Sequence, residues 1–333
     1  MDQFEGKVAV ITGSASGIGR ALAERCLAEG MHVVMADIEE AALEKTAAEF
    51  KQAGHNDVLT VQTDVAQLEA LEHLKARAID TFGAVHLLFN NAGVGGAGNA
   101  WRGSVNDRTW TIGVNLYSVI HGLRVFVPQM LDQGDACHIV NTASVAGLLG
   151  GVTNAPYSVT KHGVVALTEQ LYRDLGNEGA DQIGCSVLCP GLINTNIMSS
   201  DRNRPDTLMD APVALTPEQE AGRAMFQAML EEGMAPSQVA DIVFQAIRNQ
   251  QLYILTHTDF NERILEPRTK LRPVQIRPSA ESSSEKPWID AGSSANPTLP
   301  IARLRTDRRQ GERAIGARAP ARKDRLAARV EPT

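Results

Sequence analysis

The sequence has little of what would mark a membrane, secreted or disulfide-held protein. No apolar run reaches the roughly 20 residues needed to cross a bilayer. The first ten residues, MDQFEGKVAV, hold no basic region followed by an apolar stretch and a cleavage site. Cys26, Cys137, Cys185 and Cys189 form no CxxC pair and no zinc-type spacing. We therefore expect no signal peptide, no membrane partner and no metal site, and a cytoplasmic protein with free, buried thiols.

Charge is spread unevenly along the chain. Residues 1–266 hold 17 basic and 32 acidic residues, whereas residues 267–333 hold 15 basic and 7 acidic ones. The basic end has almost no apolar periodicity, so we expect it to be mostly disordered. This predicts one domain over residues 1–265 and a basic tail over 266–333. Such a tail could bind nucleic acid or acidic lipid, but a solvated extension is the simpler reading, and no nucleic-acid partner is expected.

Short apolar runs alternate with helical patterns ahead of the tail, in a chain that is 43% apolar. The runs are apolar on both faces, which is typical of buried parallel strands. The expected strands are Lys7–Thr12, His32–Asp37, Val58–Asp64, Val85–Asn90, Cys137–Ala143, Ile183–Cys189 and Leu252–Thr256. The expected helices are Ile18–Glu29, Glu39–Ala53, Gln67–Phe82, Asn106–Gln133 and Asn154–Asn177. The alternation predicts an α/β fold: a doubly wound, Rossmann-like parallel sheet of seven strands with helices on both faces.

A glycine-rich turn, TGSASGIGR, joins the first expected strand to the first helix. Gly13 allows the tight turn, Gly17 lets the backbone approach a pyrophosphate, and Gly19 permits close packing of helix on strand. The free N–H groups at the helix start, around Ser16 and Ile18, favour a phosphate. Ligands of such sheets bind beyond the carboxyl ends of the strands, so the turn predicts a dinucleotide site there.

An acid, Asp37, ends the second expected strand. Its carboxylate can accept hydrogen bonds from the adenosine ribose hydroxyls and would repel a 2′-phosphate. Neither Ser16 nor Ile38 supplies a compensating positive charge. We therefore expect NAD in preference to NADP. Alternatively, Asp37 caps the helix that begins near Glu39.

A serine, a tyrosine and a lysine follow in the carboxyl half of the domain. Ser144 comes after the fifth strand, and Tyr157 and Lys161 are four residues apart in a helical pattern, so they share one helix face. Lowering the pKa of a phenol from about 10 to about 7 needs about 4 kcal/mol. The Lys161 ammonium and a bound, positively charged nicotinamide could supply it together. Ser144 could hold the substrate oxygen while Tyr157 moves the proton.

These motifs resemble the single-domain branch of the short-chain dehydrogenase/reductase family over about residues 4–257. The matching positions are the glycine turn, Asp64-Val65, Asn90-Asn91-Ala92-Gly93, Asn115, Ser144, Tyr157, Lys161, and Pro190-Gly191 followed by Ile193 and Thr195. The resemblance implies an NAD(P)-dependent alcohol dehydrogenase or ketoreductase that transfers hydride between nicotinamide and substrate.

The resemblance also implies catalytic roles. Tyr157 would be the acid/base, Lys161 would lower its pKa and hold the nicotinamide ribose, and Ser144 would position the carbonyl or carbinol. Asn115 would hold a water that relays the proton to solvent. The competing interpretations are that Ser144 only ends a strand and that Asn115 is a polar helix residue.

The remaining matches are implied to hold the cofactor. Asp64 and Val65 would contact adenine, Asn90 would line the adenosine side, and Gly93 would belong to the same site. The backbone from Pro190 and Gly191 through Ile193, and the Thr195 hydroxyl, would orient the carboxamide. Thr195 could instead be a helix cap.

Three further residues near the motifs are interpreted as structural. His162 follows Lys161, and adjacent helix positions point about 100° apart, so it should face away from the phenol. Trp101 and Trp110 are interpreted as packing residues rather than substrate stackers.

The expected substrate loop, about residues 191–235, carries methionines and Phe226 among polar residues. With Val145 to Leu149 on the other wall, it favours an apolar secondary alcohol or ketone. The apolar surplus of the two long helices and the resemblance lead us to expect a homodimer or homotetramer. The alternative functions are an NAD-binding sensor or scaffold without turnover, and a nucleic-acid or membrane role of the tail.

Overall fold

The structure is a computed structural model, and it describes residues 1–258 except residues 97, 152, 212 and 213. The tail predicted over residues 266–333 lies outside the described residues. In the described part, no helix combines the length and the apolar character needed to cross a membrane.

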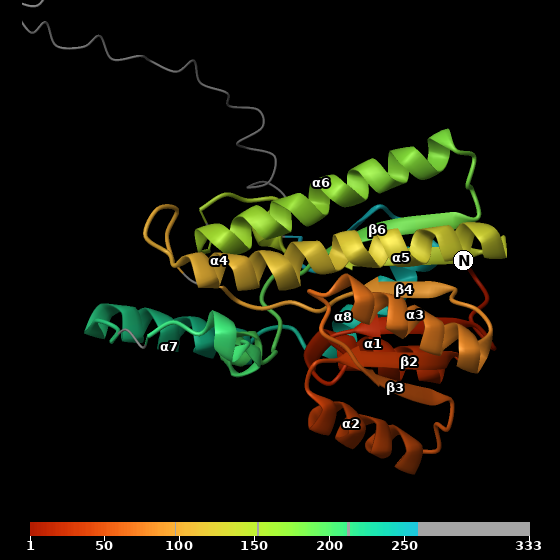
Figure 1. Cartoon of the computed structure of the whole chain (residues 1–333), viewed down its shortest axis with the longest axis horizontal. Coiled ribbons are helices and arrows are strands. Elements are labelled where there is room, and N and C mark those ends of the chain that lie inside the picture. The colour runs from red at the N-terminus through yellow and green to blue at the C-terminus, as the bar shows by residue number, and fades with distance from the viewer. Residues whose placement is uncertain (97, 152, 212–213, 259–333) are drawn as a thin grey trace, which may run out of the picture. The chain divides into compact units, whose positions relative to one another are not determined.

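Seven parallel strands form one sheet, in the order β3-β2-β1-β4-β5-β6-β7 (Figure 1). They are β1 (Val8–Thr12), β2 (His32–Asp37), β3 (Val58–Gln62), β4 (Leu87–Asn90), β5 (Cys137–Thr142), β6 (Ile183–Cys189) and β7 (Tyr253–Leu255). Two expected strands, β2 and β6, agree at both ends, and the other five are one or two residues shorter at one or both ends. The sheet reverses its order at β1 and β4, so the ends of these two strands open a crevice.

Helices cover both faces of the sheet, which confirms the predicted fold class. They are α1 (Gly17–Ala28), α2 (Glu40–Gln52), α3 (Leu68–Phe82), α4 (Val105–Ile112), α5 (Ser118–Gln133), α6 (Ala155–Asn177), α7 (Pro217–Glu231) and α8 (Pro236–Arg248). Short 3₁₀ segments span Val145–Gly147, Ile197–Asn203 and Asp206–Leu208. Helices α1, α2 and α8 pack on one face, and α3, α5 and α6 pack on the other.

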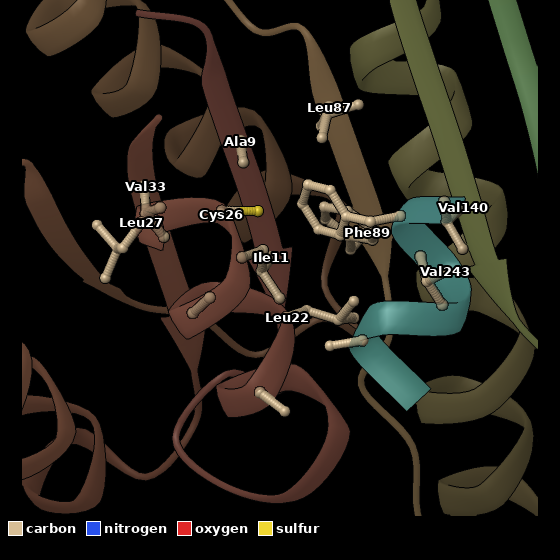
Figure 2. Close-up of a cluster of buried hydrophobic side chains, with 14 of the residues drawn as sticks. Ala9, Ile11, Leu22, Cys26, Leu27, Val33, Leu87, Phe89, Val140 and Val243 are labelled. Atoms are coloured by element: carbon tan, nitrogen blue, oxygen red, sulfur yellow. The ribbon is translucent and has the colours of Figure 1, made fainter. Parts of the chain in front are cut away.

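The core follows the two-residue period of the strands. In β1, Ala9 and Ile11 face α1 and α8, whereas Val8 and Val10 face α3 and α5. Figure 2 shows the first of these layers, in which the labelled residues from the helices are Leu22, Cys26, Leu27 and Val243. Both faces are closed to water, so ligands can reach the sheet only at its ends.

One expected helix is interrupted. The pattern predicted a single helix over Asn106–Gln133, but a π-helical turn at Gly113–Tyr117 separates α4 from α5. The wider turn places Asn115 on the inside, where it is fully buried. The apolar spacing continues on both sides of the turn, which is why the sequence pattern does not reveal it.

Helices α7 and α8 were not predicted. Helix α8 had usable signals, because Pro236 opens it and Val239, Val243 and Ile247 recur every four residues on its buried face. Helix α7 begins with a capping box between Thr216 and Gln219. It lies beyond the ends of the strands, on neither face of the sheet (Figure 1).

Candidate active site

The glycine turn between β1 and α1 has the backbone that its sequence predicts. Gly13 and Gly17 have φ values of +66° and +56°, in the left-handed region that favours glycine. A Cβ atom on Gly19 would clash with the carbonyl oxygen of Gly13. The turn therefore presents bare backbone at the start of α1, which fits a pyrophosphate.

The loop after β4 is fastened to this turn by Thr12 and Asn91, to which the sequence analysis gave no role. The Thr12 Oγ1 atom accepts hydrogen bonds from the N–H groups of Asn91 (3.0 Å) and Ala92 (3.1 Å). The Asn91 side chain donates to the Thr12 carbonyl at 3.1 Å. Thr12 is the last residue of β1. A hydroxyl side chain at the end of a strand is the sequence feature from which this role could have been predicted.

Asp37 braces the same turn from the end of β2. Its carboxylate accepts hydrogen bonds from the N–H of Ala15 in the turn (3.0 Å) and from the N–H of Glu39 before α2 (3.1 Å). Burial raises the pKa of Asp37, and these backbone donors oppose the rise. Asp37 thus contacts the residue before α2 and lines the cavity described below, but the N-cap of α2 is Glu39, so the capping alternative is not met.

Ser144, Tyr157 and Lys161 meet at the ends of β5 and α6. A side-chain hydrogen bond joins Ser144 to Tyr157, and Ser144 Oγ accepts the N–H of Ala146 at 3.1 Å. The Lys161 ammonium donates to the Thr142 carbonyl at 2.9 Å and lies 5.6 Å from the centre of the Tyr157 ring. The spacing of four residues does bring phenol and ammonium together.

Burial dominates the pKa values of this pair. It raises the pKa of the Tyr157 phenol, and the hydrogen bond with Ser144 opposes the rise. It also lowers the pKa of Lys161 to about 8. The expectation that the Lys161 ammonium and a bound, positively charged nicotinamide together bring the phenol toward a neutral pKa stays a prediction.

One cavity of about 1310 Å³ joins the glycine turn to the serine, tyrosine and lysine. Fifteen of the predicted residues line it: Gly13, Ser16, Gly17, Ile18, Asp37, Asp64, Val65, Gly93, Ser144, Tyr157, Lys161, Pro190, Gly191, Ile193 and Thr195. Three predicted residues, Gly19, Asn90 and Asn115, are not part of the lining. The volume of the cavity and its glycine-lined part fit a dinucleotide.

Asn90 and Asn115 are outside the cavity lining, and their side chains bond to the protein around it. The Asn90 amide is buried and donates to Asn141 Oδ1 at 2.9 Å, so it links β4 to β5 instead of lining the cavity. The Asn115 amide accepts the N–H of Val94 (2.8 Å) and donates to its carbonyl (2.9 Å). Its side chain holds the loop after β4. These bonds involve only the side-chain amide, so the water-holding role of Asn115 stays a prediction.

Asn154 is a positioning residue that the sequence analysis missed. Its Oδ1 atom accepts the N–H of Tyr157 at 3.0 Å and so caps α6. Its Nδ2 atom donates to the carbonyls of Gly95 (3.1 Å) and Gly96 (3.0 Å). Asparagine followed by Ala155-Pro156 is an N-cap signal, so the residue could have been found from the sequence.

The segment after β6 is fastened beside the cavity by a buried ion pair. Arg204 contacts Asp107 of α4 at 2.6 Å, and the two side chains are only 9% and 6% exposed. The guanidinium also stacks on Trp110, 4.4 Å from the ring centre. Asp210 accepts a hydrogen bond from Ser104, which caps α4. Residues 201–210 are thus held against α4 by charge and stacking.

The three residues interpreted as structural differ in their surroundings. His162 is exposed and bonded to the Ser158 carbonyl of its own helix, as expected. Trp110 is buried against Arg204 but also lines the cavity, so its burial does not separate packing from substrate contact. Trp101 is 73% exposed and is neither a packing residue nor part of the cavity. Thr195 lines the cavity, and its methyl group would lie 3.2 Å from a Cβ atom placed on Gly17. The next helical segment begins after Asn196, so Thr195 is not its N-cap residue.

The sequence also predicted free cysteines and no metal site. All four cysteines are free and buried, as expected. Within residues 1–258, apart from the positions not described, no group of three His, Cys, Asp or Glu side chains could hold a metal ion.

Comparison with known proteins gives consistent similarities. A family profile described as short chain dehydrogenase matches residues 7–206. The CLA biosynthesis dehydrogenase/reductase of Lactiplantibacillus plantarum is 33% identical over 273 residues, 81% of this chain and 94% of that protein. The 1-deoxy-11-beta-hydroxypentalenate dehydrogenase of Streptomyces exfoliatus is 31% identical over 260 residues, 78% of this chain and 86% of that protein. A crystal structure of a short-chain dehydrogenase/reductase from Burkholderia phymatum in complex with NAD has a TM-score of 0.76 and 45% identity over 80% of this chain and 94% of that one.

Proposed function

The chain belongs to the short-chain dehydrogenase family, and on that premise we propose that it is an NAD-dependent oxidoreductase interconverting an apolar secondary alcohol and its ketone. The observation that carries the proposal is that Tyr157 and Lys161 line the same cavity as Gly13 and Gly17. A sensor or scaffold without turnover would have no need of a phenol, a hydroxyl and an ammonium together at the end of that cavity.

A bound nicotinamide dinucleotide would supply the hydride acceptor or donor and, when oxidised, a positive charge near the phenol. The Ser144 hydroxyl holds the substrate oxygen, and the Tyr157 phenol donates a proton to it when a ketone is reduced. With its raised pKa, Tyr157 is protonated at neutral pH and prepared for this direction. Alcohol oxidation needs the phenolate, so it depends on the Lys161 ammonium together with the added charge.

The other lining residues would bind different parts of the dinucleotide. The N–H groups of Ser16, Gly17 and Ile18 would hold the pyrophosphate, and Asp37 the adenosine ribose. The carboxylate of Asp37 disfavours a 2′-phosphate, which supports NAD over NADP. At the far end, the backbone after Pro190 and the Thr195 hydroxyl would orient the carboxamide.

The substrate end of the cavity is mainly apolar. Its walls include Leu149, Met198, Leu208, Phe226 and Met229. Such walls favour an apolar ring system or chain around the reacting carbon. The relative from Streptomyces exfoliatus is named for a hydroxylated substrate, which agrees with a secondary alcohol.

We also propose an oligomeric state, a domain boundary and a cellular location. Exposed apolar side chains on α5 and α6, such as Ile120 and Tyr172, support a homodimer or homotetramer. We place all residues needed for turnover in residues 1–265, so a chain ending at 265 should keep its activity. The four free cysteines favour the cytoplasm, which cell fractionation would test.

A panel of secondary alcohols and ketones tests the reaction, with NAD and NADP in their oxidised and reduced forms. The absorbance of the reduced nicotinamide reports turnover. We expect NAD-linked oxidation of apolar secondary alcohols and reduction of the matching ketones. NAD binding with no turnover on any apolar substrate would favour the sensor instead.

A further inference from the structure

The segment that follows β6 lines the substrate end and also reaches the opposite end of the cavity. Arg202, in the 3₁₀ segment Ile197–Asn203, pairs with Glu39, which lies two residues after Asp37. Its Nη2 atom is 2.6 Å from Glu39 Oε1, and its Nε atom is 3.3 Å from Oε2. Asn203 donates to the same Oε1 at 2.8 Å.

The order of the strands shows what this contact spans. Strands β5, β4 and β1 lie between β6 and β2 in the sheet. At about 4.8 Å per strand, the segment crosses on the order of 19 Å of strand ends to reach Glu39. On the way, Ser200 Oγ accepts the N–H of Gly95, after β4, at 3.0 Å. The segment therefore passes over the ends of β4 and β1, where the glycine turn lies.

The contact puts a cation near Asp37, the residue assigned to the adenosine ribose. Asp37, Ile38, Glu39 and Arg202 all line the cavity. The Arg202 side chain is 40% exposed and that of Glu39 is 29% exposed, so neither is locked in the core. Burial alone would raise the pKa of Glu39, but hydrogen bonds from Arg202 and Asn203 lower it, so Glu39 is ionised at neutral pH.

We propose that Arg202 is a specificity-determining residue for the dinucleotide, and that Glu39 prevents it from pairing with a 2′-phosphate; this rests on the proposed function. Arginine binds phosphate through the same pair of N–H groups that it offers a carboxylate. Glu39 occupies those groups and adds a second negative charge two residues from Asp37. A neutral side chain at position 39 frees the guanidinium for the phosphate that distinguishes NADP from NAD.

The variant Glu39→Gln tests this proposal through dissociation constants for NAD and NADP, measured by isothermal titration calorimetry on the full chain. Glu39 makes no side-chain cap for α2, so the exchange leaves the helix start intact. We expect the ratio of the NADP to the NAD dissociation constant to fall about tenfold or more, as a new charge-assisted contact would give. In the double variant Glu39→Gln, Arg202→Gln the ratio should return to the wild-type value or above.

Glu29→Gln is the matched control. Glu29 also pairs with an arginine, Arg248, at 2.6 Å, but it lies at the end of α1 and outside the cavity. The ratio should be unchanged in this variant.

An unchanged ratio in Glu39→Gln would overturn the proposal, and so would a gain that survives in the double variant. A segment that only loosens would change both dissociation constants by the same factor, which also leaves the ratio unchanged. Wild-type protein that binds neither dinucleotide would instead contradict the proposed function.

Discussion

Lys161 is buried, and burial disfavours the charged, ammonium form of its side chain. The side chain is 3% exposed, and burial lowers its pKa from 10.5 to about 8. Below pH 8 the folded protein therefore carries a buried ammonium whose desolvation costs about 3 kcal/mol of stability. The penalty disappears as the pH rises from 8 to 10.5, because the amine is then neutral in both the folded and the unfolded chain. Such a cost is expected at a position kept for chemistry.

Lys161→Met should stabilise the protein at pH 7 and abolish its turnover. We expect a gain of about 2 kcal/mol, since the Thr142 carbonyl loses its donor at a cost of about 1 kcal/mol. The gain should vanish by pH 10.5. Urea unfolding at pH 7, 9 and 10.5 measures it, with Lys51→Met at an exposed position as the control. A variant less stable than wild type at pH 7 would contradict the assigned burial cost.

The sequence motifs predicted which residues lie near the site better than they predicted where the side chains of those residues point. The glycine turn, Ser144, Tyr157 and Lys161 were identified because their chemistry depends on backbone conformation or on a helix spacing. Asn90 and Asn115 occupy the expected strand end and helix, but their amides turn into the protein to bond Asn141 and Val94. Side-chain rotation of that kind is decided by long-range neighbours, which a local pattern does not contain.

Among the elements, the segment from β6 to α7 departs most from a simple strand–helix alternation. It has two short 3₁₀ turns, and its contacts are made by polar side chains far apart in sequence: Arg204 with Asp107, and Arg202 with Glu39. No apolar period announces such contacts, which is why it was predicted only as a loop. The regular elements were predicted because apolar spacing alone determines their burial.

Arg204→Lys should weaken substrate binding more than cofactor binding. Lysine keeps the charge but loses the planar stack on Trp110 and the guanidinium that contacts both Asp107 and Asp210. A loss of about 1 kcal/mol in holding the segment would raise the KM for the alcohol about fivefold. Steady-state kinetics and NAD titration separate the two effects, with Arg248→Lys as the control. An equal loss of affinity for alcohol and NAD would contradict a role confined to the substrate side.

At the scale of the whole molecule, helices α5 and α6 carry apolar side chains that the described residues leave exposed. Val159 and Tyr172 on α6 are 62% and 56% exposed, and Ile120 on α5 is 36% exposed. The prediction of a parallel sheet with helices on both faces was confirmed, because that arrangement follows from strand–helix alternation and right-handed crossovers. The oligomeric state cannot be predicted from the strand–helix alternation, because the same fold can have α5 and α6 covered by a second subunit or exposed to solvent.

The pair of substitutions Ile120→Glu and Tyr172→Glu should give a monomer. Two carboxylates placed in an apolar contact would have to be desolvated on association, so the assembly should dissociate. Light scattering after size exclusion measures the mass. Met225→Glu, at a 68% exposed position on α7, should leave the mass unchanged. A wild-type chain that already runs as a monomer would contradict the proposed assembly.

The most direct test of the central claim is Tyr157→Phe, which removes one oxygen atom from the end of the cavity. The phenol is the proposed proton donor and acceptor, and the pyrophosphate and adenosine contacts lie elsewhere in the cavity. We predict that hydride transfer, followed by the absorbance of reduced nicotinamide, falls by about 1000-fold or more, while the dissociation constant for NAD changes by less than about twofold. Turnover at the wild-type rate in this variant would contradict the account.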